Sequence, residues 1–150
     1  MRRLALPLLG ILLVGVLASP ADAKSYSIFS ADTEIVVNDD ASLSVTEKIT
    51  YDFSGSFSGA YRDIPLRQGE SISNVSVSDA GGAYELGGCV DLGCNSPQGT
   101  YGITSIPGHA RIVWHYQAAD QHHEFTVTYT MTGVATAYDD VIDVNIQVWG

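Results

Sequence analysis

Apolar and polar positions alternate from Ser42 to Phe53, and this is the most regular pattern in the chain. A period of two is typical of a β-strand with one buried face. The apolar row holds Leu43, Val45, Glu47, Ile49, Tyr51 and Phe53. A carboxylate in such a row costs several kcal/mol unless a cation pairs with it. The following segment supplies Arg62, so we predict a buried ion pair between Glu47 and Arg62.

Shorter alternating segments recur along the rest of the chain. We predict strands at residues 29–37, 42–53, 71–78, 83–86, 100–106, 111–118, 124–132 and 141–149. Helical periodicity is absent after residue 23. About eight strands at these spacings predict an all-β fold, specifically an antiparallel β-sandwich. In the first strand we place Phe29, Ala31, Thr33, Ile35 and Val37 on one face.

Turn and loop residues separate these strands. Residues 38–41, Asn-Asp-Asp-Ala, favour a turn, so the first two strands should form a hairpin. Residues 54–59 are rich in Ser and Gly and are interpreted as an exposed loop. Pro65 limits pairing beyond that loop because it has no N–H. We expect Asp63 to cap the turn before Pro65.

The first 23 residues have the organisation of an export signal. Arg2 and Arg3 precede an apolar segment, residues 4–17, and a small-x-small cleavage site follows at 21–23. The apolar segment has about fourteen residues, whereas a membrane-spanning helix needs roughly twenty. We therefore expect cleavage after Ala23 and one extracytoplasmic domain from 24 to 150; an uncleaved signal anchor is the alternative.

The net charge of residues 24–150 excludes some classes of binding partner. Residues 24–150 contain five basic and sixteen acidic residues, a formal net charge of −11 with His neutral. Such a surface repels nucleic acid and anionic lipid head groups. We exclude both as direct partners of this domain.

The chain has two cysteines, Cys89 and Cys94. In an exported protein such a pair predicts a disulfide, which we place at the edge of the fold because Gly and Asp surround it. Metal ligation is the alternative. With no His close to them in sequence, two cysteines supply half a metal site.

A second metal hypothesis concerns the histidines. His115 is assigned to the outward face of its strand, and His122 and His123 follow near the next turn. In a hairpin they could approach one another, with Asp120 or Glu124 as a further ligand. Their spacing fits no zinc motif, so an ordinary polar hairpin is the better interpretation.

Other candidate chemistry is outweighed by structural roles. The acidic pairs at 39–40 and 139–140 lack the alternating spacing of a calcium loop. Arg62 and Asp63 could grip an anionic ligand, but Glu47 favours a structural role for Arg62. Tyr101 and Tyr138 could stack on sugars, although core packing is the commoner use of such rings. No catalytic motif is present, and we predict no catalytic residues, no resident metal and no cofactor.

Two segments carry a family resemblance. Residues 40–51, Asp-Ala-Ser-Leu-Ser-Val-Thr-Glu-Lys-Ile-Thr-Tyr, and residues 57–65, Phe-Ser-Gly-Ala-Tyr-Arg-Asp-Ile-Pro, match best, with further matches at 125–133 and 139–150. The chain resembles the N-terminal domain of bacterial and archaeal predicted membrane proteins catalogued as domain of unknown function 2207. In similar proteins this domain follows a signal peptide, faces outward and precedes transmembrane helices. The resemblance implies a membrane anchor outside these residues, and it brings no reaction or ligand.

The chain departs from the family pattern near its end. Ile146 and Gln147 stand where the family often has Trp-Asn, and family members continue past the last Gly. We therefore expect the domain to be truncated at Gly150. An uncovered edge strand there would allow weak self-association.

Three functional hypotheses follow from the sequence. The first is a non-catalytic interaction module on the extracellular face of the envelope, with an envelope or extracellular protein as partner. The second is a carbohydrate- or peptide-binding domain of the cell wall, which a cleft lined by Tyr rings would favour. The third is a hydrolase of unrecognised type, which two close, desolvated carboxylates in a cavity would favour.

Overall fold

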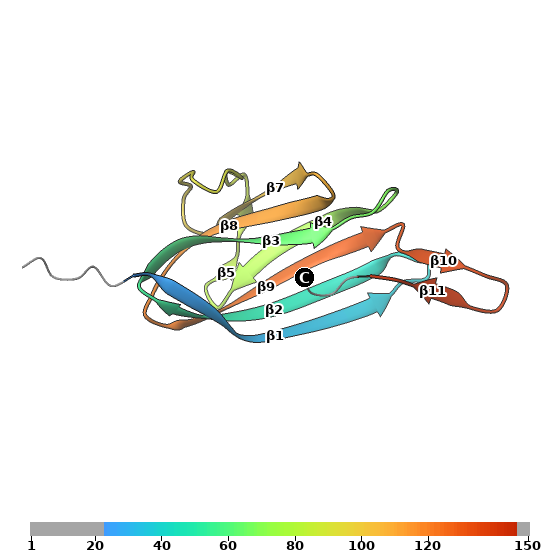
Figure 1. Ribbon diagram of the computed structural model, residues 1–150, viewed down its shortest axis with the longest axis horizontal. Helices are drawn as coiled ribbons and strands as arrows, with labels where there is room; N and C mark the ends of the chain where they lie inside the picture. The colour runs from blue at the N-terminus through green and yellow to red at the C-terminus, as the bar shows by residue number, and fades with distance from the viewer. Residues whose placement is uncertain (1–22, 147–150) are drawn as a thin grey trace, which may run out of the picture.

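The computed structural model describes residues 23–146, which form an all-β domain (Figure 1). The larger sheet has the order β1 (Ser25–Val37), β2 (Leu43–Ser54), β9 (His122–Thr132), β4 (Ser71–Asp79) and β5 (Gly82–Ala83). The second sheet has the order β3 (Ser56–Pro65), β8 (His109–Ala119), β7 (Thr100–Ile106) and β6 (Glu85–Leu86). A separate hairpin comprises β10 (Ala135–Ala137) and β11 (Ile142–Val144).

The prediction of packed antiparallel sheets is confirmed. The long strands pair antiparallel, and the short β6–β7 pair is parallel. Within residues 23–146 there is no helix of the length and apolarity that crossing a membrane requires. The predicted export signal spans residues 1–23, and of these only Ala23 belongs to the described residues.

The core lies between β2 and β9 of one sheet and β8 of the other. The alternation in β2 has the predicted phase, because every second residue from Leu43 to Phe53 is buried, Glu47 included. Trp114 on β8 packs against Phe125 on β9 with ring centroids 5.5 Å apart. Both side chains are fully buried, and aromatic pairs of this kind contribute much of the energy of a core.

The two sides of the sandwich differ. On one side the sheets end in β5 and β6, two-residue strands joined through Tyr84, so the chain itself bridges the layers. On the other side they end in β1 and β3, which belong to different sheets and each pair with one neighbour among the described residues. Within the described residues the sandwich is therefore closed at β5–β6 and open at β1–β3.

The loop predicted at residues 54–59 is wrong, because most of it belongs to β3. Strand β3 begins at Ser56 directly after a turn at Gly55, whose φ is +86°. A register shift between Phe57 and Gly59 interrupts the period of two. Small residues and a β-bulge therefore concealed this strand. Pro65 is its last residue, as its missing N–H requires.

The first strand was assigned too short and partly in the wrong phase. β1 begins at Ser25, and its register against β2 shifts between Ile28 and Ser30. Phe29 consequently lies on the outer face, 66% exposed, with its ring 4.5 Å from that of His122. Tyr26 and Ile28 take the inward phase in its place, opposite Phe53 and Tyr51.

Two further strand predictions need correction. Residues 83–86 are divided between β5 and β6, which join different sheets. Of the strand predicted at 141–149, only Ile142–Val144 is extended within the described residues, as β11; residues 147–150 lie outside them. β11 pairs with β10 in a hairpin that projects beyond the main sheets (Figure 1). The expectation of a truncated edge strand therefore falls largely on residues that the structure does not describe.

Candidate functional site

The buried charge on β2 has the predicted partner. Arg62 of β3 donates from Nε to Glu47 Oε2 at 2.8 Å and from Nη2 to Glu47 Oε1 at 3.1 Å. The hydroxyl of Tyr129 on β9 donates to the same Oε1 at 2.8 Å. The Glu47–Arg62 pair thus joins the two sheets through the core, and Tyr129 is a partner that the sequence did not indicate.

The surroundings of this pair hold Arg62 charged and Tyr129 neutral. Burial opposes the charge on Arg62, but hydrogen bonding to Glu47 and the charge of Glu47 outweigh it and raise the pKa of the guanidinium. Burial, reinforced by the charge of Glu47, raises the pKa of Tyr129 well above its usual range. Tyr129 therefore stays neutral and remains a hydrogen-bond donor to the carboxylate.

Asp63 has a different role from the predicted cap. It lies within β3, directly opposite Arg111 of β8. Arg111 donates to both Asp63 carboxylate oxygens, from Nε at 2.6 Å and from Nη2 at 2.7 Å. These bonds lower the pKa of Asp63 despite partial burial. The Arg111 guanidinium also lies over the Tyr61 ring, 4.6 Å from its centroid.

A groove of about 400 Å³ opens between β1 and β3. Its walls carry six aromatic rings, those of Tyr26, Tyr51, Phe53, Phe57, Tyr61 and Tyr116. Tyr26 contacts Tyr51 and Phe57 with ring centroids 5.9 and 6.0 Å apart. Phe53 stacks on Phe57 at 4.8 Å. Edge-to-face and stacked packing of this kind fixes the rings before any ligand arrives.

The rings of the groove are partly accessible. Tyr26 is 63% exposed and Tyr61 is 47% exposed. Tyr51 lies deeper, where burial raises its pKa to about 12. The hydroxyl of Tyr116 is buried and has no hydrogen-bond partner among the described residues. An unpartnered buried hydroxyl costs free energy, so Tyr116 is a costly polar group in the floor of the groove.

The two tyrosines for which sugar stacking was the alternative to core packing, Tyr101 and Tyr138, do not line this groove. Tyr101 is buried, 7% exposed, and donates a hydrogen bond to the Val75 carbonyl at 2.7 Å. The favoured interpretation of Tyr101 as a core residue is confirmed, because β7 turns its ring into the core. Tyr138 is 60% exposed, in the turn between β10 and β11.

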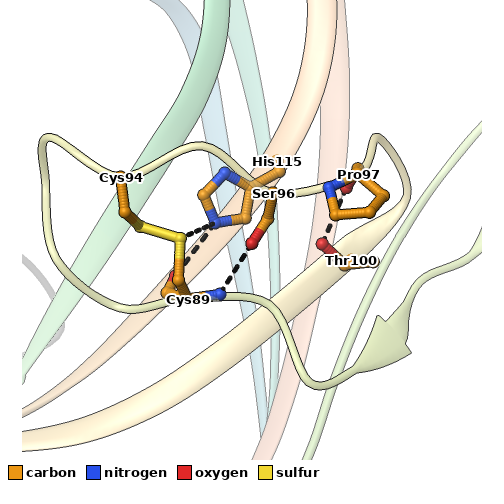
Figure 2. The surroundings of a disulfide bond; sticks show 6 residues. All are labelled: Cys89, Cys94, Ser96, Pro97, Thr100 and His115. Atoms are coloured by element: carbon orange, nitrogen blue, oxygen red, sulfur yellow. Dashed lines mark hydrogen bonds between the residues drawn. A yellow bond between two sulfur atoms is a disulfide. The ribbon is translucent and has the colours of Figure 1, made fainter.

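The predicted disulfide is present between Cys89 and Cys94, in the loop between β6 and β7 (Figure 2). His115 of β8 lies beneath this loop. Because a carbonyl only accepts, His115 Nε2 donates to the Cys89 carbonyl, at 2.9 Å; the same nitrogen is 3.9 Å from Cys89 Sγ. His115 is 5% exposed. Its outward phase was right, but the loop covers it, so the cysteines do have a histidine beside them.

The histidine metal site considered as the less favoured alternative at the hairpin does not form among the described residues. His122 Nε2 lies 3.3 Å from Asp52. His123 Nε2 donates to Asp79 Oδ2 at 2.8 Å, and Tyr84 donates to the same oxygen at 2.9 Å. Burial opposes the charge on Asp79, but these two bonds and the Gly81 N–H lower its pKa overall.

Within residues 23–146 the one group of three side chains arranged for a metal is Cys89, Cys94 and His115.

In the first turn, Asp40 forms hydrogen bonds within the turn itself. Asp40 accepts from both the N–H and the hydroxyl of Ser42, at 3.0 and 2.6 Å. These bonds lower the pKa of Asp40, and the predicted turn chemistry is confirmed.

Fold and groove together define a class, an all-β sandwich with an open aromatic side and a disulfide-closed loop. The chain belongs to the DUF2207 family. The model described as "Predicted membrane protein (DUF2207) N-terminal domain" matches residues 27–150, which confirms the resemblance stated from the sequence motifs. Comparisons with curated proteins and with solved structures found no significant match.

Proposed function

We propose that this domain is the outward-facing recognition module of a membrane-anchored envelope protein, and that it binds its ligand in the groove between β1 and β3 without transforming it. The observation that carries the proposal is the groove itself. It is concave, aromatic and largely formed in advance, as ligand sites usually are.

An extracellular location is supported by three features. A disulfide favours an oxidising compartment. The family is described as the N-terminal domain of predicted membrane proteins. The first residues have the pattern of an export signal. These features favour a domain outside the membrane, held there by segments of the parent protein.

Binding rather than catalysis is supported by the charges beside the groove. Arg62 and Asp63 both line it, and each is committed to an ion pair, with Glu47 and Arg111 respectively. A catalytic acid or base needs a carboxyl or imidazole whose proton can move. Asp63 is instead held ionised by Arg111, which lowers its pKa.

The partner that the geometry favours is an extended segment of another envelope protein. Edge strands β1 and β3 flank the groove, and each leaves one row of backbone N–H and C=O groups without a strand partner among the described residues. An extended peptide can pair with such an edge while its alternate side chains enter pockets. The rings of Tyr26 and Tyr61 would receive those side chains.

A displayed random-peptide library tests this proposal. Peptides selected on the wild-type chain should bind Tyr26→Ala and Tyr61→Ala at least ~10-fold more weakly, because exposed aromatic anchors dominate such interfaces. Phe29→Ala is the matched control, since this ring is equally exposed on β1 but faces away from the groove. Equal losses in all three variants, or no selectable peptide, would contradict a peptide-binding groove.

A carbohydrate ligand is the second candidate, and the four tyrosines of the groove favour it. Tyrosine offers a flat apolar face and a hydroxyl, which suits a sugar ring. Sedimentation with insoluble cell-wall polysaccharide provides the test. Retention of the wild type and of Phe29→Ala, with loss of Tyr26→Ala and Tyr61→Ala, would assign the groove to carbohydrate.

A further inference from the structure

The loop between β6 and β7 brings two cysteines over His115 of β8, and together these make three potential metal ligands. The ligand atoms of Cys89, Cys94 and His115 all lie within 4.8 Å of one another. Figure 2 shows the imidazole turned toward the disulfide from β8. We propose that this loop is a redox-gated zinc site, in which reduction of the disulfide frees two thiolates that bind Zn²⁺ together with His115.

The spacing suits zinc once the sulfurs separate. Zn–S bonds of about 2.3 Å and Zn–N bonds of about 2.0 Å place tetrahedral ligands roughly 3.3–3.8 Å apart. The Cys89 and Cys94 Cα atoms are 6.4 Å apart, and His115 Nε2 is already 3.9 Å from Cys89 Sγ. The three atoms therefore reach one metal ion through side-chain rotation and a small movement of the loop.

One ligand of the site is held rigidly. His115 lies in the middle of β8, which is paired on both sides with β3 and β7. Gly88 allows the loop to lie close over it, since a Cβ at that position would come within 3.1 Å of the imidazole Cδ2. Reduction frees the cysteines, whereas the sheet keeps the imidazole in position.

The site has room for a fourth ligand. A hollow of about 300 Å³ beside the loop is lined by Cys94, His115 and Asp91, among others. Zinc sites with three protein ligands keep their fourth position for water or another oxygen donor. Two thiolates and an imidazole favour Zn²⁺ over Ca²⁺ or Mg²⁺, which prefer oxygen ligands.

The chemistry balances with a dithiol reductant. The Cys89–Cys94 bond accepts two electrons and two protons and becomes two thiols, while the reductant's two thiols become a disulfide. Zinc binding then releases both thiol protons to solvent. The imidazole proton moves from Nε2 to Nδ1, which leaves Nε2 as the ligand and breaks its hydrogen bond to the Cys89 carbonyl.

Zinc titration of the whole chain tests the site. A trialkylphosphine reduces the disulfide and is itself oxidised to the phosphine oxide, with the oxygen taken from water. This reductant adds no thiol that could compete for zinc. Competition with a chromophoric chelator should give about one equivalent of Zn²⁺, bound at least ~100-fold more tightly by the reduced chain than by the oxidised one. Co²⁺ as a probe should show thiolate-to-metal charge-transfer bands.

Variants separate this site from adventitious binding. Cys94→Ser changes a partly exposed loop residue and should abolish the charge-transfer bands of a two-thiolate site and the stabilisation by Zn²⁺ in thermal melts. His115→Gln keeps a donor for the Cys89 carbonyl and should weaken binding at least ~10-fold. His122→Gln, on an exposed ring of β9 in the other sheet, should change nothing. Equal zinc affinity in both redox states, or wild-type affinity in His115→Gln, would overturn the proposal.

Discussion

At the scale of single residues, the buried carboxylate of Glu47 depends on its hydrogen-bond partners. It is fully buried and accepts three hydrogen bonds, two from Arg62 and one from Tyr129. A buried ion pair of this kind adds little to stability compared with an apolar core, but removing one partner leaves the other charge buried and unpaired. The pair therefore fixes how the two sheets meet.

The first prediction concerns this pair. Glu47→Ala should lower the free energy of unfolding by ~3 kcal/mol or more, because it strands the Arg62 guanidinium in the core. Urea denaturation measures the change. Asp63→Asn is the control, since its pair with Arg111 is partly exposed, and its loss should be clearly smaller. A cost under ~1 kcal/mol for Glu47→Ala, typical of an exposed pair, would contradict the account.

The second prediction concerns Asp79. Its pKa is lowered in the folded chain from an ordinary value near 3.8, against the effect of burial, by bonds from His123, Tyr84 and the Gly81 N–H. The unfolded state therefore binds a proton more readily than the folded state. The stabilisation is complete above about pH 4 and is lost as the pH falls through the lower, folded pKa.

The stability difference between wild type and Asp79→Asn should accordingly be largest near neutral pH and should shrink as the pH falls below about 4 and through the lowered pKa of Asp79. Urea midpoints at several pH values provide the measurement. A difference that stays constant down to pH 2 would show that the charge of Asp79 contributes nothing to folding.

At the scale of elements, the alternation of apolar and polar residues predicted the features that depend on residues close together in the sequence. The phase of β2, the hairpin at 38–41 and the fold class are all encoded by neighbouring residues and are confirmed. The ion pair was predictable because a buried Glu47 requires a cation. β3 was missed because Gly and Ser residues and a β-bulge conceal its period. The shifted phase of Phe29 has the same cause.

Contacts that depend on strand register could not be derived from the sequence. Arg111 meets Asp63 because β3 and β8 pair in one particular register. His115 meets the cysteines because a loop distant in sequence folds over β8. Neither juxtaposition leaves a local pattern, so the candidate site was only partly predictable, and the aromatic groove was not predicted at all.

The third prediction concerns the end of β9. Gly133 has φ +80°, and a Cβ there would collide with the Gly69 carbonyl. Gly108 has a similar φ of +73° but open space around it. Gly108→Ala should cost about 1 kcal/mol for the left-handed backbone. Gly133→Ala should cost about 1–3 kcal/mol more because of the collision. Equal losses of stability for Gly108→Ala and Gly133→Ala, in thermal or urea unfolding, would contradict this prediction. They would show that the structure around Gly133 adjusts to a Cβ at no cost.

At the scale of the whole molecule, the domain is asymmetric in a way that bears on function. The β5–β6 side is closed by the chain and leads into the disulfide loop, whereas the β1–β3 side is open and aromatic. Among the described residues, the open side has strand edges without a partner strand, which proteins usually protect. The proposed partner, an extended peptide segment, would cover this side when bound.

The fourth prediction concerns export of the whole chain. If residues 1–23 are a signal peptide, the secreted protein should begin at Lys24. Expression in a bacterial host followed by N-terminal sequencing and intact mass measurement tests this. A chain that stays in the membrane fraction and retains residues 1–23 would instead support an uncleaved signal anchor.

The central claim is that the groove between β1 and β3 is the ligand-binding site. The most direct test is to map backbone amide chemical shifts while adding a peptide selected on the wild-type chain. The account predicts that the perturbed amides lie in Ser25–Ile28 and in Gly59–Asp63, with the Phe29–His122 face unchanged. Shift changes confined to that outer face or to the β10–β11 hairpin, with unchanged amide shifts in the groove, would contradict it.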